Sequence, residues 1–358
     1  MNEAHPQTAD IGFQVERGIA FVTLNRPKAL NALTLEMIQA IASRLSRWAS
    51  DPAVHAVVIQ GEGERAFCAG GDVRAVYDSV KAAPSDLHRA FFVDEYRLNR
   101  AIHRFPKPYI ALIDGITMGG GMGLSVHGGI RVATERTLSA MPETGIGLFP
   151  DIGATWFLNR CPGRLGLYLA LTGARLRGAD VLYAGIATDF VESGRLAELK
   201  RALGEADWSR DPSETASTTV RRFAGSPGEA ALRQHESAID RAFAGDSVEA
   251  ILAELAGLKT EWANATLATL AGKSPTSLKL TLEQLRRGKT LSIEAALIME
   301  FRMVQRCMAG HDFFEGIRAL LVDKDLKPVW RPQHLEEVRA ADIEAYFAPL
   351  GAADLRFD

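Results

Sequence analysis

Two carboxylates stand out in the sequence because they lie in a loop that is otherwise apolar and rich in glycine and proline. Glu143 and Asp151 both belong to the segment MPETGIGLFPD at residues 141–151. Apolar surroundings raise the pKa of a carboxyl group by desolvation, which suits the group to act as an acid, a base or a nucleophile. On spacing alone a structural role has equal weight, and Asp151 could cap a helix that starts near residue 152.

Two glycine-rich loops form a second candidate feature. The loops Ala69-Gly70-Gly71-Asp72 and Gly119-Gly120-Gly121 each follow an expected strand and precede an expected helix. The first turn of a helix leaves backbone N–H groups unpaired, and glycine lets a ligand approach them closely. A single loop of this kind usually makes only a tight turn. If the fold brings both loops to one point, their N–H groups could bind a developing oxyanion, as acyl-transfer and enolate chemistry require.

Other kinds of catalytic or binding site lack their motifs. The chain contains no G-x-x-x-x-G-K-[ST] loop, and residues 119–123 do not complete G-x-G-x-x-G after their strand. Ser125 lacks the closing glycine of G-x-S-x-G, so we interpret Ser125 and His127 as packed helix residues. The eight histidines show neither i, i+4 pairs nor clusters with carboxylates, so no metal site is expected. The three cysteines are too few for a disulfide framework and favour a reducing compartment with buried free thiols.

The elements that must position these residues change in type along the chain. Between residues 12 and 190, short β-branched runs alternate with amphipathic helical stretches and glycine-rich connections, which predicts an α/β core. We expect strands near residues 19–24, 54–60, 109–113 and 130–133, and helices near residues 34–48, 91–105 and 124–127. Beyond about residue 196 the strand-like runs stop. We therefore predict an α/β core at residues 11–200 and an all-helical C-terminal region at residues 201–358.

Composition narrows the classes of partner. With 358 residues and 47% hydrophobic content, the chain can bury a large core. Its 41 basic and 44 acidic side chains leave a formal net charge of -3, which predicts neither a nucleic-acid nor a membrane partner. No apolar run reaches the ~18 residues that a membrane helix needs. The first ten residues lack the features of a secretory or organellar leader, which predicts a cytoplasmic location.

Four segments in order resemble the crotonase superfamily of enoyl-CoA hydratases and isomerases. They are NRPKALNAL at residues 25–33, AFCAGGD at 66–72, the stretch 115–123 and Pro142-Glu143, and the resemblance spans about residues 12–190. It implies a core built as a spiral of ββα turns and an oxyanion hole formed by the backbone N–H groups of Gly71 and Gly120. It also implies that Lys28, Ala29, Leu30 and Arg74 border the adenine and phosphates of the substrate's coenzyme A part, and that Ala69 binds the substrate.

The resemblance also defines the expected partners. Because coenzyme A is part of the substrate in this superfamily, it implies a small acyl-CoA ligand and no separate cofactor. The negative charges of coenzyme A make a basic residue such as Arg74 a sensible neighbour even in a chain of net charge -3. Members of the superfamily often assemble as trimers or hexamers, so a homo-oligomer is expected as well.

The chain departs from the superfamily's hydratases at one catalytic position. Those enzymes use two glutamates, of which the second matches Glu143, whereas Gly123 occupies the first position here. This departure argues against hydration of an enoyl thioester. Further segments at residues 125–128, 274–279, 311–316 and 323–324 resemble the members that hydrolyse 3-hydroxyacyl-CoA thioesters, and they extend the resemblance to nearly the whole chain.

This closer resemblance implies hydrolysis of a 3-hydroxyacyl-CoA thioester, with 3-hydroxyisobutyryl-CoA from valine degradation as the expected substrate. Glu143 would either attack the thioester carbonyl or activate a water, and the sequence leaves that choice open. Asp151 and, by resemblance, Glu95 would hydrogen-bond the 3-hydroxyl group or the water. The neighbours of Glu95 taken alone predict a solvated helix face. Two alternatives stay open: a hydratase or isomerase that uses Glu143 alone, and a CoA-binding protein without activity.

Overall fold

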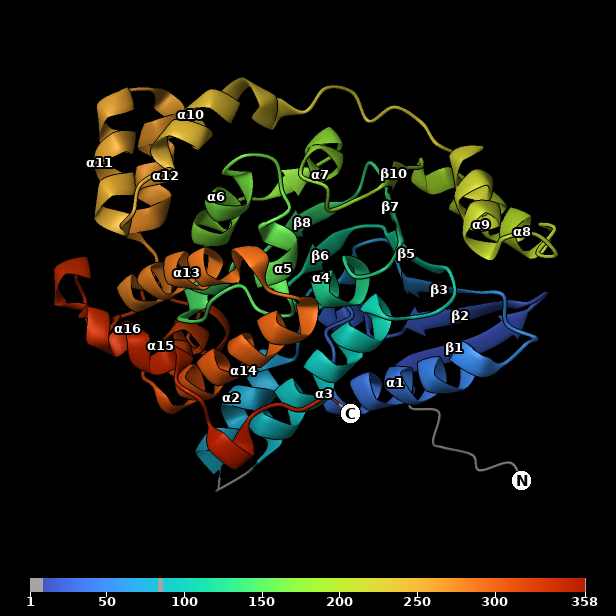
Figure 1. Ribbon diagram of the computed structural model, residues 1–358, viewed down its shortest axis with the longest axis horizontal. Coiled ribbons are helices and arrows are strands. Elements are labelled where there is room, and N and C mark those ends of the chain that lie inside the picture. Colours follow the sequence, from blue (N-terminus) through green and yellow to red (C-terminus); the bar gives the residue numbers. More distant parts are fainter. Residues whose placement is uncertain (1–8, 83–85, 358) are drawn as a thin grey trace. The chain divides into compact units, whose positions relative to one another are not determined.

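Runs of aliphatic and β-branched residues form the larger of two sheets. We describe the chain with a computed structural model, which describes residues 9–82 and 86–357. The larger sheet has the strand order β1-β2-β3-β5-β7-β10, in which β1 is antiparallel to β2 and the other neighbours are parallel (Figure 1). Its strands are β1 (Ile11–Glu16), β2 (Ile19–Leu24), β3 (Ala56–Gly61), β5 (Tyr109–Ile113), β7 (Ile130–Ala133) and β10 (Asp189–Phe190). The turn between β1 and β2 has positive φ at Arg17 and Gly18, as a tight hairpin requires.

A smaller sheet of four short strands carries the glycine-rich loops. Its order is β4-β6-β8-β9, with β4 parallel to β6 and β8 antiparallel to β9. The strands are β4 (Ala66–Cys68), β6 (Ile116–Met118), β8 (Leu138–Ala140) and β9 (Leu176–Arg177). One predicted glycine loop follows β4 directly, and the other lies between β6 and α4 (Gly120–Ser125). Both loops therefore leave neighbouring parallel strands.

Helices cover both faces of the larger sheet (Figure 1). The helix α1 (Leu35–Ser50) is capped by the Thr34 side chain, and its apolar stripe includes Trp48, whose ring lies 5.9 Å from that of Phe13 on β1. The opposite face, with Ile19 and Val58, packs against α8 (Leu196–Gly204) and α9 (Pro212–Arg221). Successive strand residues point to opposite faces, so β2 and most of β3 are buried on both sides, whereas most residues of the edge strand β1 are exposed.

The chain forms two compact units, each assembled from three separate segments. The first unit comprises residues 1–72, 97–139 and 176–230, and contains the two sheets. The second comprises residues 73–96, 140–175 and 231–358, and is largely helical. The division at residue 200 that the sequence predicts follows a change in composition, and it stays a prediction.

The second unit contains helices from the first half of the chain and most of the C-terminal helices. The helices are α2 (Val73–Ala82), the start of α3 (Leu87–His103), α5 (Ala154–Leu158), α6 (Leu165–Thr172), α10 (Glu236–Ala242), α11 (Val248–Leu258), α12 (Glu261–Ala271), α13 (Pro275–Arg287), α14 (Ile293–Ala309), α15 (Asp312–Ile317) and α16 (Ala340–Phe347). Serine or threonine caps several of them, for example Ser274 at α13 and Ser292 at α14. Both α13 and α14 contact the short helix α5, which follows the predicted Asp151 loop.

The predicted fold class is confirmed, with small corrections at element ends. The core is α/β, and after α7 (Ala179–Tyr183) and β10 the described residues form helices and connections only. The helix predicted to include residues 124–127 ends at Ser125, because the chain turns there before β7. Ser125 is fully buried and its Oγ donates to the carbonyl oxygens of Gly121 and Met122, each at 3.1 Å, which confirms a packing role.

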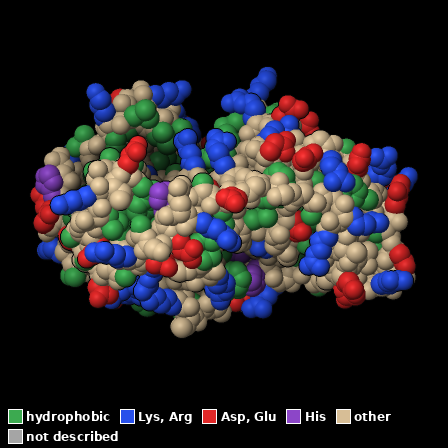
Figure 2. Space-filling view, turned by 90° about the horizontal axis from the view of Figure 1, so that it is seen from above, with side chains coloured by type: hydrophobic (Ala, Val, Ile, Leu, Met, Phe, Trp, Pro, Cys, Tyr) green, Lys and Arg blue, Asp and Glu red, His purple; other side chains and the backbone are tan. Residues whose placement is uncertain are grey.

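The surface charges, the cysteines and the possible membrane or metal-binding features can be described together. Figure 2 shows basic and acidic side chains interspersed over the visible face. All three cysteines are free and buried, as predicted. In the part of the chain that the structure describes, no helix is both long and apolar enough to cross a membrane, and no three metal-ligating side chains gather in a suitable cluster.

Candidate active site

The first unit brings two predicted substrate-binding segments together. The amide of Ala69 donates to the carbonyl oxygen of Leu30 at 3.0 Å, and the amide of Leu33 donates to that of Gly70 at 2.9 Å. The amide of Asp72 in turn donates to Leu33 at 2.8 Å. The turn that contains Lys28, Ala29 and Leu30 therefore lies directly beside the first glycine loop.

The two glycine loops also approach each other closely. Gly70 has φ +114°, and a Cβ atom there would lie 3.2 Å from the Met118 carbonyl oxygen and 3.6 Å from the Gly120 nitrogen. A Cβ atom on Gly121 would lie 2.1 Å from the carbonyl oxygen of Cys68. Glycine is thus required at both positions by backbone conformation or by close approach. The structure brings together the two loops that the sequence predicts as oxyanion-binding elements.

Both predicted oxyanion donors are available in the first unit. Among the described residues, neither the backbone N–H of Gly71 nor that of Gly120 donates a hydrogen bond to a protein acceptor. Gly120 is the first residue of α4, where helical geometry leaves the N–H groups unpaired. Unpaired N–H groups on adjoining loops are what an oxyanion needs, because they stabilise negative charge without reorganisation.

The predicted basic contacts with coenzyme A have different surroundings. Lys28 and Ala29 are exposed in the short turn Pro27–Ala29 of the first unit. Arg74 belongs to the second unit, where it is exposed on α2 and its Nε lies 2.8 Å from Asp78 Oδ2. That ion pair already engages the Arg74 guanidinium, and the role of Arg74 in coenzyme A binding stays a prediction.

The three predicted carboxylates share one buried cluster in the second unit. Glu95 lies on α3, Glu143 opens the 3-10 turn Glu143–Ile146, and Asp151 precedes α5; their exposed fractions are 3%, 5% and 5%. Burial, and then the charges of Asp151 and Glu143, raise the pKa of Glu95 well above its ordinary value. Burial followed by the charge of Asp151 does the same for the pKa of Glu143. These mutual effects indicate a cluster of carboxylates suited to proton transfer or nucleophilic work.

Two sequence interpretations are corrected here. Local sequence predicts Glu95 on a solvated helix face, but Glu95 is buried because this end of α3 packs within the second unit. The suggested helix cap at Asp151 is also wrong. Helix α5 begins at Ala154 and its N-cap is Gly153, with no side-chain cap bond. The Asp151 carboxylate therefore does not cap α5.

Glu143 combines an unpaired oxygen with a nearby cation. Its Oε2 is buried and accepts no hydrogen bond from the described part of the chain. Lys273 Nζ reaches the same turn, since it would lie 3.2 Å from a Cβ placed on Gly145. Burial lowers the pKa of Lys273, and the positive charge of Lys273 opposes the rise in the pKa of Glu143. Sequence analysis missed Lys273, which is 130 residues away from its partner in the printed sequence.

Tyr96 is a second residue that sequence analysis missed. Its hydroxyl donates to Asp151 Oδ2 at 2.7 Å, and both side chains are buried. Burial raises the pKa of Asp151 to about 6, while the Tyr96 hydrogen bond acts in the opposite direction. Burial and the charge of Asp151 raise the pKa of Tyr96 well above its usual range, so Tyr96 remains a hydrogen-bond donor at neutral pH. The only signal in the sequence was its position beside Glu95.

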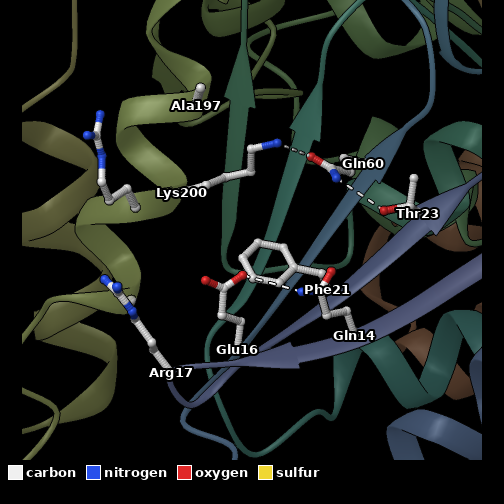
Figure 3. A pocket seen from close by; sticks show the side chains of 10 residues that line it. Gln14, Glu16, Arg17, Phe21, Thr23, Gln60, Ala197 and Lys200 are labelled. Atoms are coloured by element: carbon white, nitrogen blue, oxygen red, sulfur yellow. Dashed lines mark hydrogen bonds between the residues drawn. The ribbon is translucent and has the colours of Figure 1, made fainter.

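A pocket of about 500 Å³ lies elsewhere, between β1–β2 and α8 in the first unit (Figure 3). It is lined by Gln14, Glu16, Arg17, Phe21, Thr23, Gln60, Ala197, Lys200, Arg201 and Gly204. Lys200 Nζ donates to Gln60 Oε1 at 2.8 Å, and Gln60 Nε2 donates to Thr23 Oγ1 at 3.1 Å. None of the predicted catalytic or substrate-binding residues lines this pocket.

Known proteins resemble this chain along almost its full length. A model of the enoyl-CoA hydratase/isomerase family matches residues 19–347. A Gallus gallus protein is 49% identical over 351 residues, which cover 97% of this chain and 91% of that protein. Proteins from Xenopus tropicalis and Homo sapiens are 50% and 47% identical, each over 94% of this chain and 88% of the relative. All three are named "3-hydroxyisobutyryl-CoA hydrolase, mitochondrial".

Two solved structures also match the chain along almost its full length, but these proteins are described as other enzymes. A structure described as a carnitinyl-CoA dehydratase from Mycobacterium thermoresistibile is 43% identical, with a TM-score of 0.91 over 98% of this chain and 99% of that chain. One described as an enoyl-CoA hydratase from Rhodobacter sphaeroides 2.4.1 is 40% identical, with a TM-score of 0.90 over 97% of this chain and 100% of that chain. The resemblance therefore extends through the helical C-terminal region as well as the α/β core.

Proposed function

The chain belongs to the enoyl-CoA hydratase/isomerase family, and from that premise we propose that it hydrolyses 3-hydroxyisobutyryl-CoA to 3-hydroxyisobutyrate and coenzyme A. Relatives of that name are 47–50% identical over more than nine tenths of the chain. The observation that carries the proposal is the buried carboxylate cluster around Glu143, whose Oε2 has no protein partner among the described residues. Gly123 at the place of the hydratases' first glutamate supports the same reaction.

The glycine loops supply the electrostatic part of the proposed reaction. When the thioester carbonyl is attacked, its oxygen becomes negative and is bound by the N–H groups of Gly71 and Gly120. Removing one donor of this kind typically costs about 3 kcal/mol of transition-state stabilisation. The carbon–sulfur bond then breaks, the electron pair leaves on sulfur, and the thiolate takes a proton to become coenzyme A.

Glu143 supplies the attacking group in either of two ways. It attacks the carbonyl to form a transient mixed anhydride that water then opens, or it removes a proton from a water that attacks directly. In both routes Glu143 must be ionised at the start. Its burial makes the carboxylate more basic than an exposed one, and the charge of Lys273 helps to keep it ionised.

Asp151 and Glu95 provide the proposed selectivity for hydroxylated acyl groups. Glu95 Oε1 is buried and accepts no hydrogen bond from the described residues, while Asp151 Oδ2 accepts one from Tyr96. A substrate hydroxyl would donate to one of these carboxylates, whereas an acyl chain without it would leave a buried acceptor unsatisfied. A site built in this way rejects the analogue that lacks the hydroxyl.

A second candidate function is hydration or isomerisation of an enoyl-CoA with Glu143 as the sole glutamate acid or base. The two solved structures at 40–43% identity, which are described as a carnitinyl-CoA dehydratase and an enoyl-CoA hydratase, favour it. The hydrolase proposal is preferred because the relatives with higher identity have that name and because Gly123 cannot transfer a proton. The third candidate, a CoA-binding protein without activity, does not explain why three carboxylates are buried together.

The expected ligand, cofactor, oligomeric state and location follow from the same resemblance or from the sequence. The substrate is a small acyl-CoA, and coenzyme A leaves as a product, so no separate cofactor is proposed. A homo-oligomer stays a prediction. The cytoplasmic location also stays a prediction, since it rested on residues 1–10, of which residues 1–8 lie outside the described part of the chain. The names of the curated relatives specify mitochondria for those proteins.

A panel of three thioesters tests the proposed function. Thiol release is measured with 3-hydroxyisobutyryl-CoA, with isobutyryl-CoA, which has the same carbon skeleton without the hydroxyl, and with crotonyl-CoA. We expect fast release from the hydroxylated thioester and release at least tenfold slower from isobutyryl-CoA. Loss of the crotonyl-CoA enone absorbance without thiol release would instead establish the hydratase.

A further inference from the structure

A fully buried carboxylate from the C-terminal region binds the backbone that follows Asp151. Glu300 lies on α14 with an exposed fraction of 0%. Its Oε2 accepts the N–H of Gly153 at 2.7 Å, and its Oε1 accepts the N–H of Thr155 at 2.8 Å. The two bound amides lie two and four residues after Asp151, so Glu300 is attached to the turn between Asp151 and α5.

Gln284 on α13 fixes the same turn from its other end. Its Nε2 donates to the carbonyl oxygen of Pro150 at 2.7 Å and to Thr155 Oγ1 at 2.8 Å, and it lies 3.4 Å from Glu300 Oε1. Gln284 is also fully buried. The backbone is therefore held directly before Asp151 and again after it.

The turn needs such support because its backbone is strained. Ile152 has φ +57° and Gly153 has φ +85°, so two successive residues adopt the left-handed region. A β-branched residue is rarely found there, and it persists only when the surrounding structure holds it. Ile152 is fully buried, and the adjacent Gly153 amide is one of the two that Glu300 accepts. The strained turn and the buried carboxylate therefore belong to one arrangement.

Stability alone is a poor explanation for Glu300. Burial, and to a smaller extent the charge of Asp151, raises its pKa to about 8, although its hydrogen bonds with Gly153 and Thr155 act against that rise. Burying a carboxyl group without a cation is costly, and an apolar side chain would fill the same space more favourably. Directed acceptance of two particular N–H groups is what an apolar residue cannot provide.

We propose that Glu300 is a positioning residue that holds the strained turn 151–155 and thereby fixes the direction of the Asp151 carboxylate toward the substrate's hydroxyl group. The inference rests on the proposed function in one respect, namely that Asp151 contacts the substrate. The attachment of the turn itself does not depend on which reaction is catalysed. Helix α14, far along the chain from the acidic loop, thus contributes to substrate selection.

The test compares Glu300→Gln with wild type. Glutamine keeps the size of the side chain but has one acceptor oxygen, so one of the two backbone amides would face its NH₂ group. We expect thiol release from 3-hydroxyisobutyryl-CoA to fall at least tenfold and the preference over isobutyryl-CoA to fall with it. If Glu300 acts through Asp151, the double variant with Asp151→Asn will be no slower than Asp151→Asn alone.

A matched control separates positioning from general destabilisation. Leu297 is fully buried on the same helix and is apolar, so Leu297→Val is expected to lower the melting temperature without changing the preference between the two thioesters. If Glu300→Gln resembles this control, or if its effect multiplies with that of Asp151→Asn, then Glu300 does not position Asp151 and the inference is wrong.

Amide hydrogen exchange tests the inference even if the proposed reaction fails. If wild type releases no thiol from any of the thioesters, the proposed function is refuted while the attachment of the turn is still open to measurement. Exchange at residues 152–155 is expected to be at least tenfold faster in Glu300→Gln and unchanged in Leu297→Val. Equal protection in wild type and Glu300→Gln would overturn the inference.

Discussion

The hydrogen bond from Tyr96 to Asp151 gives a quantitative prediction. In Tyr96→Phe the carboxylate loses a donor at 2.7 Å, and hydrogen bonds to charged groups contribute about 1.5–3 kcal/mol. Because about 1.4 kcal/mol corresponds to one pH unit, the pKa of Asp151 should rise by about 1 to 2 pH units. The sign is upward because the Tyr96 hydroxyl stabilises the ionised form of Asp151, which is the stronger acceptor for the substrate's hydroxyl hydrogen.

The assay is the pH dependence of thiol release from 3-hydroxyisobutyryl-CoA. With a pKa of about 6 in the wild type, Asp151 is largely ionised at pH 7. After the substitution roughly half to a tenth of the molecules would be ionised at that pH, so the rate should fall about two- to tenfold and recover toward pH 9. The acid limb of the profile should therefore move to higher pH while the plateau changes little.

Tyr109→Phe is a matched control for this experiment. Tyr109 is also buried, but its hydroxyl donates to the Leu124 carbonyl oxygen at 3.0 Å rather than to a carboxylate. Its loss should cost about 1 kcal/mol of stability without moving the acid limb. Superimposable pH profiles for Tyr96→Phe and wild type would refute the reasoning, because Asp151 would then not titrate in the reaction.

Three further predictions concern the charge near Glu143, the glycine loops and the selectivity of the site. In Lys273→Met the pKa of Glu143 should rise further, because a positive charge that favours its ionised form is lost, so activity at neutral pH should fall and return at higher pH. In Gly121→Ala a Cβ would lie 2.1 Å from a backbone oxygen, so thermal unfolding should show a loss of about 1–3 kcal/mol, whereas Gly129→Ala, where nothing lies within 4 Å, should be neutral. Asp151→Asn should slow thiol release from 3-hydroxyisobutyryl-CoA by about 5- to 150-fold, equivalent to about 1–3 kcal/mol, and leave the slow isobutyryl-CoA rate nearly unchanged in parallel assays.

Sequence predicted the glycine loops and the acidic loop because their requirements are local. The conformations of Gly70 and the close approach at Gly121 are backbone properties that glycine-rich segments reveal directly. Glu143 and Asp151 could be singled out because carboxylates in an apolar, Pro- and Gly-rich segment are expected to have perturbed pKa values. The alternation of strands and helices predicted the α/β core in the same way.

The supporting residues could not be predicted from local sequence because tertiary packing selects them. Tyr96 lies 55 residues from Asp151, and Glu300 lies 147 residues from Gly153, which it binds. Glu95 was placed on a solvated face because its neighbours on α3 are charged, and only packing within the second unit buries it. Polar groups that position a catalytic loop leave no periodic pattern of their own.

The most direct test of the central claim is thiol release from 3-hydroxyisobutyryl-CoA by Glu143→Gln, a variant of equal size that can neither attack the carbonyl nor accept a proton. An exposed glutamate in the turn Leu335–Glu337 provides the control Glu336→Gln, which should retain full activity. With the melting temperature of both variants close to that of wild type, we predict that Glu143→Gln is slower by about 10²- to 10⁴-fold, the usual contribution of a positioned base. A folded Glu143→Gln protein that releases thiol within threefold of the wild-type rate would contradict the account.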